Sequence, residues 1–344
     1  MAPASSEVTV GIAGLGYWGP NLVRNFRLLD GCRVTAVADP DPNRVAGLRR
    51  LYPDLRPYPS AEDLIDDPAI DAVVLALPAS LLPDLSIRAL NEGKHVLIEK
   101  PMANRLEDAL GMEAVAAVNS LVAMVDFTFV YSPAVRFLRS IVQSGEFGAP
   151  HYYQSSRMNL GRFRTDIDVV WDLVVHDISI LMHVLERSPS TVLAIGRGRS
   201  NSVADTAHVT LTYEDGFRAF IHASWLAPVK VRQALFACQR GMIAYDDVHP
   251  DEKIRVYQVE EQFDPENEES VIPTFRLGDV LIPRLSPEEP LRTMASTFVD
   301  AIKDGAPTPT DWLFGTRVLS VLDAAHRSLE HGEPASVLER VPAA

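Results

Sequence analysis

Short runs of aliphatic and β-branched residues alternate with amphipathic stretches along the first third of the chain. The apolar runs begin at residues 8, 33, 72, 95 and 121 and read VTVGIAG, RVTAVAD, AVVLALP, HVLIEK and LVAMVDF. Strands that are apolar almost throughout are typical of a parallel sheet that is covered by helices on both faces. The alternation therefore predicts an α/β domain with a parallel sheet over residues 1–126.

The pattern changes after residue 126. A strand is expected over residues 152–158, and amphipathic or apolar periodicity predicts helices over residues 132–144, 171–186, 291–303 and 311–330. Alternating runs between them are joined by turn signals at Asp215-Gly216 and Arg240-Gly241, which indicate an antiparallel meander. Residues 250–290 show no clear period. We expect an α+β second domain, with a largely antiparallel open sheet and C-terminal helices, over residues 127–344.

Bulk properties narrow the class of protein. The 344 residues carry a formal net charge of -14, which argues against contacts with nucleic-acid phosphates, and 47% are hydrophobic, which suits a large core. The two cysteines, Cys32 and Cys238, lack metal-type spacing. The first residues do not resemble a leader peptide, and the longest apolar run contains Pro78 and is too short to span a membrane. These features predict a cytoplasmic protein with neither a nucleic-acid nor a membrane partner.

A glycine-rich turn connects the first expected strand to the first expected helix. It reads GLGYWG, and its candidate cofactor contacts are Gly14, Gly16, Tyr17, Trp18 and Gly19. The first glycine permits a tight turn, the second lets the backbone approach a pyrophosphate, and the third allows the helix to pack closely on the strand. The helix N-terminus then faces the anion. Strand, glycines and helix together predict a Rossmann domain that binds a dinucleotide.

The end of the second expected strand discriminates between cofactors. Asp39 stands 20 residues after Gly19, where its carboxylate can accept hydrogen bonds from the ribose hydroxyls. A 2′-phosphate would meet this negative charge, so NAD is expected in preference to NADP. Arg44 is near enough in sequence to swing toward such a phosphate. Trp18 is expected either to cover the nicotinamide or to be a packing residue.

Three further motifs resemble the Gfo/Idh/MocA family of oxidoreductases. Glu99-Lys100-Pro101 ends a strand of the first domain, Asp172 to His176 is similar to the family's D-x-x-x-H helix, and residues 298–332 are similar to its C-terminal helices. More narrowly, the chain resembles the branch that acts on sugars and nucleotide-linked sugars in GYWGPNLVRNF, FVYSPAVR, Trp171-Asp172-Leu173 with His176-Asp177, and Trp225 with Pro228, Lys230, Val231 and Arg232.

The resemblance implies a fold, a site and an assembly. It implies a Rossmann domain followed by an open, largely antiparallel sheet, with the active site in the cleft between them and a sheet face that pairs subunits into a homodimer or homotetramer. It places Lys100 beside the nicotinamide and the reacting oxygen, and it makes His176 a catalytic residue. It also implies a cis peptide bond between Lys100 and Pro101, and it adds Pro78, Glu99 and Lys100 to the cofactor contacts.

Chemical reasoning on the residues points to the same groups. Hydride transfer from a carbinol carbon requires a base that removes the hydroxyl proton, and His176 has the right side chain. Lys100 can donate a hydrogen bond to the alcohol oxygen and stabilise the developing alkoxide. Asp172, the third catalytic candidate, lies one helical turn before His176 and shares its face, so the two could share a substrate or hold one another in orientation. We expect His176 to be the acid/base and Lys100 its electrostatic partner, although the two roles could be exchanged.

The remaining candidates bear on the substrate. Residues expected to contact it are Asp126, Arg157, Asn159, Arg162, Trp225, Lys230 and Arg232. The basic members suit a phosphorylated or nucleotide-linked sugar, or else pair with acids of the chain. Leu82 and Asp126 depart from the family, which commonly has His at the first position and His or Asn at the second. A metal site made by Asp168, Asp172 and His176 is disfavoured, because no His or Cys cluster lies nearby, so no metal is expected.

These observations favour one function over two others. The leading hypothesis is an NAD-dependent dehydrogenase or ketoreductase for a sugar or nucleotide-linked sugar, with C3 of a hexose as one option. An enzyme that oxidises its substrate transiently and regenerates its NAD is a related alternative. A non-catalytic NAD-binding sensor is the third, and the combination of Lys100, Asp172 and His176 argues against it.

Overall fold

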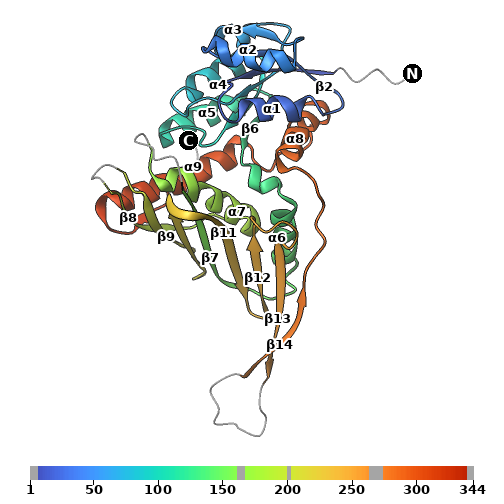
Figure 1. Cartoon of the computed structure of the whole chain (residues 1–344). Helices are drawn as coiled ribbons and strands as arrows, with labels where there is room; N and C mark the ends of the chain where they lie inside the picture. Colours follow the sequence, from blue (N-terminus) through green and yellow to red (C-terminus); the bar gives the residue numbers. More distant parts are fainter. Residues whose placement is uncertain (1–6, 161–166, 200–202, 263–273, 339–344) are drawn as a thin grey trace. The chain divides into compact units, whose positions relative to one another are not determined.

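The computed structural model describes residues 7–160, 167–199, 203–262 and 274–338 (Figure 1). They form two compact units. The first contains residues 1–132 and 288–319, and the second contains residues 133–287 and 320–344. The change of pattern at residue 126 therefore lies close to the first division between the units.

The first unit contains a parallel sheet of six strands in the order β3-β2-β1-β4-β5-β6. Its strands are β1 (Val8–Ala13), β2 (Cys32–Ala38), β3 (Arg56–Tyr58), β4 (Ala72–Leu75), β5 (His95–Glu99) and β6 (Ala123–Asp126). The helices between them are α1 (Gly19–Phe26), α2 (Pro42–Leu51), α3 (Ala61–Ile65), α4 (Leu82–Asn91) and α5 (Leu106–Val118). The five apolar runs are all strands, which confirms the α/β prediction. The strand order reverses between β1 and β4, and such switch points bind ligands at the carboxyl ends of the strands.

Two C-terminal elements require a correction to the domain boundaries. Helix α8 (Pro290–Asp304) and the start of α9 (Trp312–His331) belong to the first unit, although the sequence analysis assigned both helices to the second domain. Phe298 of α8 packs edge-on against Phe26 of α1, with 6.3 Å between the ring centroids. Trp312 Nε1 donates to the carbonyl of Met124 at 3.4 Å. These contacts join residues far apart in sequence, so local periodicity could not place them.

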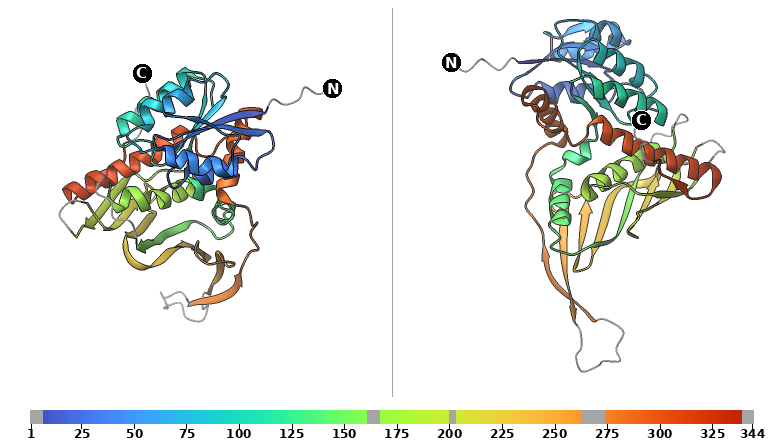
Figure 2. Two further views of the ribbon diagram at one scale, coloured as in Figure 1. Left: turned by 45° about the horizontal axis from the view of Figure 1, so that its top comes forward. Right: turned by 180° about the vertical axis from the view of Figure 1, so that it is seen from behind.

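The second unit contains a sheet of nine strands in the order β14-β13-β12-β11-β7-β10-β9-β8-β15. They are β7 (Pro150–Leu160), β8 (Thr191–Arg197), β9 (Thr206–Thr212), β10 (Arg218–Ser224), β11 (Leu226–Cys238), β12 (Gly241–Asp246), β13 (Ile254–Gln262), β14 (Thr274–Leu281) and β15 (Ala335–Ser336). Helices α6 (Pro133–Ser144) and α7 (Val175–Leu185) lie on the same face of this sheet (Figures 1 and 2). The α+β prediction is confirmed.

The expected antiparallel meander is interrupted by one strand. β7 lies between β10 and β11, parallel to β10 and antiparallel to β11. The turn signals at Gly216 and Gly241 correctly mark the hairpins β9-β10 and β11-β12. No sequence pattern near residue 225 predicts the inserted strand, because β7 lies more than 60 residues earlier in the chain. Among the described residues, no helix has the length and apolar composition needed to cross a membrane.

Candidate active site

The glycine turn after β1 is built so that two of its glycines are sterically required. Gly14 has a φ of 92°, a conformation that strongly favours glycine, and a Cβ there would lie 2.2 Å from the Ala76 carbonyl oxygen. A Cβ on Gly19 would lie 2.0 Å from the Gly14 carbonyl oxygen. Both glycines therefore serve the tight turn and the close packing of α1 on β1, as the motif predicts.

The middle glycine has a different environment. Apart from its two chain neighbours, no described residue has an atom within 4 Å of a Cβ placed on Gly16, so packing against the described residues does not require glycine there. Helix α1 begins at Gly19, and within the described part of the chain no side chain caps its N-terminus by a hydrogen bond. Tyr17 and Trp18 beside it are exposed. An open backbone position before an uncapped helix N-terminus suits a pyrophosphate. The turn fits the diphosphate of a dinucleotide.

Gly16 therefore offers a clean test of cofactor binding. The variant Gly16→Val should fold normally, because the new side chain points into open space, but it should weaken NAD binding about 10-fold or more by blocking the approach of the pyrophosphate. Titration calorimetry with NAD measures the change. Gly111→Ala in α5, which also meets nothing within 4 Å, is the matched control and should bind NAD like the wild type. Unchanged NAD affinity in Gly16→Val would place the cofactor elsewhere.

Asp39 follows β2 and is buried beneath the glycine turn. Its Oδ2 accepts a hydrogen bond from the Leu15 backbone N–H at 2.7 Å, and its Oδ1 accepts one from the Asp41 N–H at 2.8 Å. The carboxylate therefore also fixes the turn. Arg44 Nη1 lies 3.5 Å from Asp39 Oδ2 and belongs to a half-exposed side chain. At the end of β2, therefore, the carboxylate of Asp39, which would disfavour a 2′-phosphate, lies beside the guanidinium of Arg44, which would attract one.

The carboxyl ends of β5 and β6 bring two acids and a lysine together. Glu99 and Asp126 are register partners, and Lys100 directly follows Glu99. Burial raises the pKa of Asp126 to about 6, although a 2.6 Å hydrogen bond from Thr128 and the charge of Lys100 act in the opposite direction. Burial and then the charge of Asp126 raise the pKa of Glu99 well above its usual range, which Lys100 opposes. The Lys100-Pro101 peptide is cis, which confirms the prediction.

In the second unit, Asp172 and His176 lie where a π-helical turn meets α7. Asp172 belongs to the π-helix η2 (Val170–Val174), and His176 lies in the first turn of α7. Such π-turns occur frequently at functional sites. Trp225 Nε1 donates to Asp172 Oδ2 at 3.0 Å, and the indole is fully buried. Asp168 Oδ1 caps the helix start, accepting from the N–H groups of Val170 and Trp171 at 2.9 and 3.1 Å.

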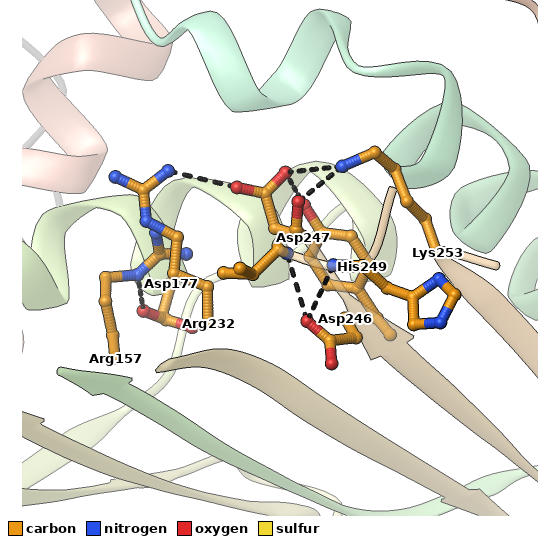
Figure 3. Close-up of polar contacts among 9 residues, drawn as sticks. Arg157, Asp177, Arg232, Asp246, Asp247, His249 and Lys253 are labelled. Atoms are coloured by element: carbon orange, nitrogen blue, oxygen red, sulfur yellow. Dashed lines mark hydrogen bonds and ion pairs between the residues drawn. The ribbon is translucent and has the colours of Figure 1, made fainter. Parts of the chain in front are cut away.

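A buried ion pair anchors α7 to the sheet immediately after His176 (Figure 3). Arg157 Nε donates to Asp177 Oδ2 at 2.6 Å, and the Tyr153 hydroxyl donates to Asp177 Oδ1 at 3.0 Å. The two donors lie on β7, and the charged side chains are 4% and 3% exposed. Arg157 therefore holds the helix that carries His176.

Breaking this pair should destabilise the protein strongly. Asp177→Ala leaves the Arg157 charge buried without its carboxylate, and such a loss typically costs about 3–5 kcal/mol of unfolding free energy. Urea unfolding followed by circular dichroism measures it. Asp215→Ala is the control, because it removes the exposed partner of Arg187 in the same unit and should cost less than about 1 kcal/mol. Equal losses in the two variants would contradict the structural importance of the buried pair.

A second group of charges lies on β11 and in the segment after β12. Arg232 Nη1 lies 3.0 Å from Asp247 Oδ2, and Lys253 Nζ lies 3.7 Å from Asp247 Oδ1 (Figure 3). Lys230 is exposed two residues before Arg232. The sequence did not indicate Asp247 or Lys253, because no motif includes either residue and Lys253 lies in the stretch of residues 250–290 that has no clear period.

The structure shows the burial and the protein partners of several predicted substrate contacts. Arg157 and Trp225 are buried among protein groups, so we reassign them from ligand contacts to residues that support Asp177 and Asp172. Asn159 is half-buried on β7, whereas Arg162 lies outside the described residues. Pro78 is exposed in the turn after β4, and Leu82, which starts α4, is fully buried.

Comparisons with known proteins agree with this geometry. Residues 8–127 match a family described as an oxidoreductase family with an NAD-binding Rossmann fold, and residues 135–244 match the GFO/IDH/MocA C-terminal domain. The protein is thus an NAD-binding oxidoreductase of the dehydrogenase class. The chain belongs to the Gfo/Idh/MocA family, as its motifs indicated.

Individual relatives narrow the comparison. The chain is 29% identical over 219 residues to the UDP-N-acetylglucosamine 3-dehydrogenase of Acidithiobacillus ferrooxidans, covering 63% of this chain and 67% of that one. It is 24% identical to the myo-inositol 2-dehydrogenase of Thermotoga maritima over 334 residues, covering 93% and 96% of the two chains. A crystal structure of the Acidithiobacillus enzyme has a TM-score of 0.81 and 25% identity, covering 94% of this chain and 97% of that one.

Proposed function

We propose that this protein is an NAD-dependent dehydrogenase that transfers hydride between nicotinamide and a secondary alcohol or ketone of a sugar or nucleotide-linked sugar. The observation that carries the proposal is the meeting of Lys100 with the acids Glu99 and Asp126 at the carboxyl edge of a parallel sheet whose glycine turn fits a diphosphate. The names of the two relatives, one acting on a nucleotide sugar and one on an inositol, support the substrate class.

The proposed chemistry divides between Lys100 and His176. When bound, NAD supplies the hydride acceptor. We propose that His176 takes the hydroxyl proton of the substrate and that Lys100 donates a hydrogen bond to the same oxygen as negative charge develops. Asp172, held by Trp225, accepts a hydrogen bond from a substrate hydroxyl or orients His176. The roles of His176 and Lys100 remain exchangeable in this proposal.

The preference for NAD over NADP rests on Asp39. We propose that its carboxylate accepts hydrogen bonds from the ribose and repels a 2′-phosphate more strongly than Arg44 attracts one. The burial of Asp39, compared with the half-exposed Arg44, supports this order, because a buried charge acts through a medium of lower dielectric constant. Titration with both cofactors tests it, and equal affinities would count against it.

We also propose that the chain forms a homodimer or homotetramer through the face of the nine-stranded sheet that α6 and α7 leave uncovered. Phe220 and Leu235 are exposed on β10 and β11, and the rings of His208 and His222 stack at 4.3 Å on β9 and β10. Exposed apolar groups on a sheet face suit a self-complementary interface. Light scattering measures the assembly.

Absorbance at the nicotinamide band tests the proposed function directly. The purified protein is incubated with NAD and, in separate reactions, with nucleotide sugars, neutral sugars and inositols. Net formation of NADH with a member of these classes supports the proposal. NAD that stays bound through purification, while a sugar is consumed without net NADH, would replace it with the transient-oxidation reaction. A protein that binds NAD and turns over none of these substrates contradicts it.

A further inference from the structure

Two cations of the second unit, Arg232 and Lys253, contact the carboxylate of Asp247, and the exposed Lys230 lies two residues before Arg232. We name Lys230, Arg232, Lys253 and Asp247 the basic cluster. In Figure 3 the Arg232 guanidinium and the Lys253 ammonium group approach the Asp247 carboxylate from opposite sides. The cluster is also tied together through the main chain, because the Asp247 N–H donates to the Arg232 carbonyl at 2.9 Å and Lys253 Nζ donates to the Asp247 carbonyl. Its geometry is therefore fixed by β11 and the segment that follows β12.

The basic cluster lies on the same sheet as Arg157, which pairs with Asp177, the residue after His176. Arg232 on β11 is the register partner of Arg157 on β7. Burial patterns place both side chains on the inward face of the sheet, where Ala234 and Phe236 are also buried. Side chains of register partners on neighbouring strands stand side by side. The basic cluster therefore adjoins the β7 residues that anchor α7.

Positive charge exceeds negative charge within the cluster. Asp247 is the acid that contacts both Arg232 and Lys253, while Arg157 is paired with Asp177. Two nearby acids are engaged elsewhere. Asp246 accepts hydrogen bonds from Gln233 Nε2 at 2.8 Å and from the Val248 N–H at 3.0 Å, with its carboxylate on the other side of the strand, and Glu252 pairs with Arg255.

The pKa shifts of Lys230 and Asp247 agree with several cations lying close together. The charge of Arg232, followed by burial, lowers the pKa of Lys230. Burial alone would raise the pKa of Asp247, but the Arg232 hydrogen bond and the charges of Lys253 and Arg232 hold it below its usual value. Such a cluster stands out in a chain with a net charge of -14, which would otherwise repel an anionic ligand.

We propose that the basic cluster binds an anionic substituent of the sugar substrate, either a phosphate or a carboxylate. This inference rests on the proposed function and narrows its substrate class to anionic sugars. Arg232 would provide the planar fork that matches a phosphate or carboxylate, and Lys230 and Lys253 would add point charges on flexible stems. Asp247 holds Arg232 and Lys253 in place.

The test measures ligand binding without requiring turnover. Titration calorimetry in the presence of saturating NAD uses four probes: UDP-N-acetylglucosamine, N-acetylglucosamine 1-phosphate, glucuronate and neutral N-acetylglucosamine. The first two carry phosphate and the third carries carboxylate, so their comparison distinguishes the two sources of negative charge. We expect at least one anionic probe to bind about 10-fold more tightly than the neutral sugar, with an affinity that falls as salt concentration rises.

Charge-removing variants then assign the effect to the cluster. Lys230→Gln alters an exposed side chain and leaves the fold undisturbed, and Arg232→Gln removes the fork that contacts Asp247. Each should weaken the anionic probe about 10-fold and leave neutral N-acetylglucosamine unchanged. Arg255→Gln is the matched control, because Arg255 is a cation of the same unit that already pairs with Glu252, and it should have no effect.

The outcomes separate this inference from the proposed function. Equal affinity for neutral and anionic probes, or undiminished anion binding in both Lys230→Gln and Arg232→Gln, overturns the basic cluster as the anion site. A wild-type protein that binds an anionic sugar and loses it in these variants, but never reduces NAD with any sugar, retains the anion site and refutes the dehydrogenase. Turnover of neutral inositols by a protein that neither binds nor turns over any of the anionic sugars supports the dehydrogenase and overturns the cluster.

Discussion

Lys100→Met should lower kcat for the confirmed substrate by about 10²- to 10⁴-fold, while the affinity for NAD changes by less than about 3-fold. Methionine keeps the length and apolar stem of lysine but removes the ammonium group that would donate to the reacting oxygen. The other residues proposed to bind NAD, from Gly14 to Gly19 and at Asp39, are untouched by the substitution. Steady-state kinetics and calorimetry with NAD measure the two quantities separately.

A second readout distinguishes a lost catalytic group from a damaged fold. The charge of Lys100 lowers the pKa values of Glu99 and Asp126, so its removal should move the pKa of Asp126 above its value of about 6. Carboxyl resonances followed by NMR against pH report this shift. Lys303→Met, on an exposed position of α8 in the same unit, is the control and should alter neither kcat nor the titration. A Lys100→Met enzyme with wild-type kcat would remove Lys100 from the mechanism.

Local sequence patterns were sufficient to predict the glycine turn and the acid at the end of β2. Gly14 and Gly19 are required by backbone atoms within a few residues or on the adjoining strand, and Asp39 fixes the turn through N–H groups nearby. A βα unit is compact in sequence, so its strand, turn and helix leave a readable motif. The position of Lys100 next to the acid Asp126 also follows from parallel order, because β5 and β6 are consecutive strands.

The partners of the charged and aromatic residues in the second unit depended on pairings between segments that are distant in sequence. From the sequence, Arg157 was expected to contact the substrate. In the fold β7 packs beneath α7, and Asp177 of that helix pairs with Arg157. Trp225 was also expected to contact the substrate, but in the folded chain its indole donates a hydrogen bond to Asp172. Lys253 and Asp247 have no motif, and they join Arg232 only because β12 pairs with β11. Charged residues have no periodicity that reveals their partners, so sequence alone cannot separate a buried ion pair from an open binding group.

His176→Asn should lower kcat/KM by about 10²- to 10⁴-fold, because asparagine keeps hydrogen-bonding capacity but cannot accept and release a proton. The anchor formed by Asp177, Arg157 and Tyr153 lies one residue beyond the substitution and remains intact, so the unfolding free energy should stay close to that of the wild type. His151→Asn, exposed on β7, is the matched control and should leave kcat/KM unchanged. Wild-type activity in His176→Asn would contradict an acid/base role.

The double variant decides whether His176 and Lys100 serve one chemical step. If both act on the proton and charge of the same oxygen, each single variant already loses most of their joint effect, and the double variant should be about as slow as the slower single one. Independent contributions would instead multiply the two losses. A multiplicative result would assign Lys100 to cofactor or substrate positioning and leave His176 as the sole acid/base, because groups that act as a unit in one transition state do not contribute additively.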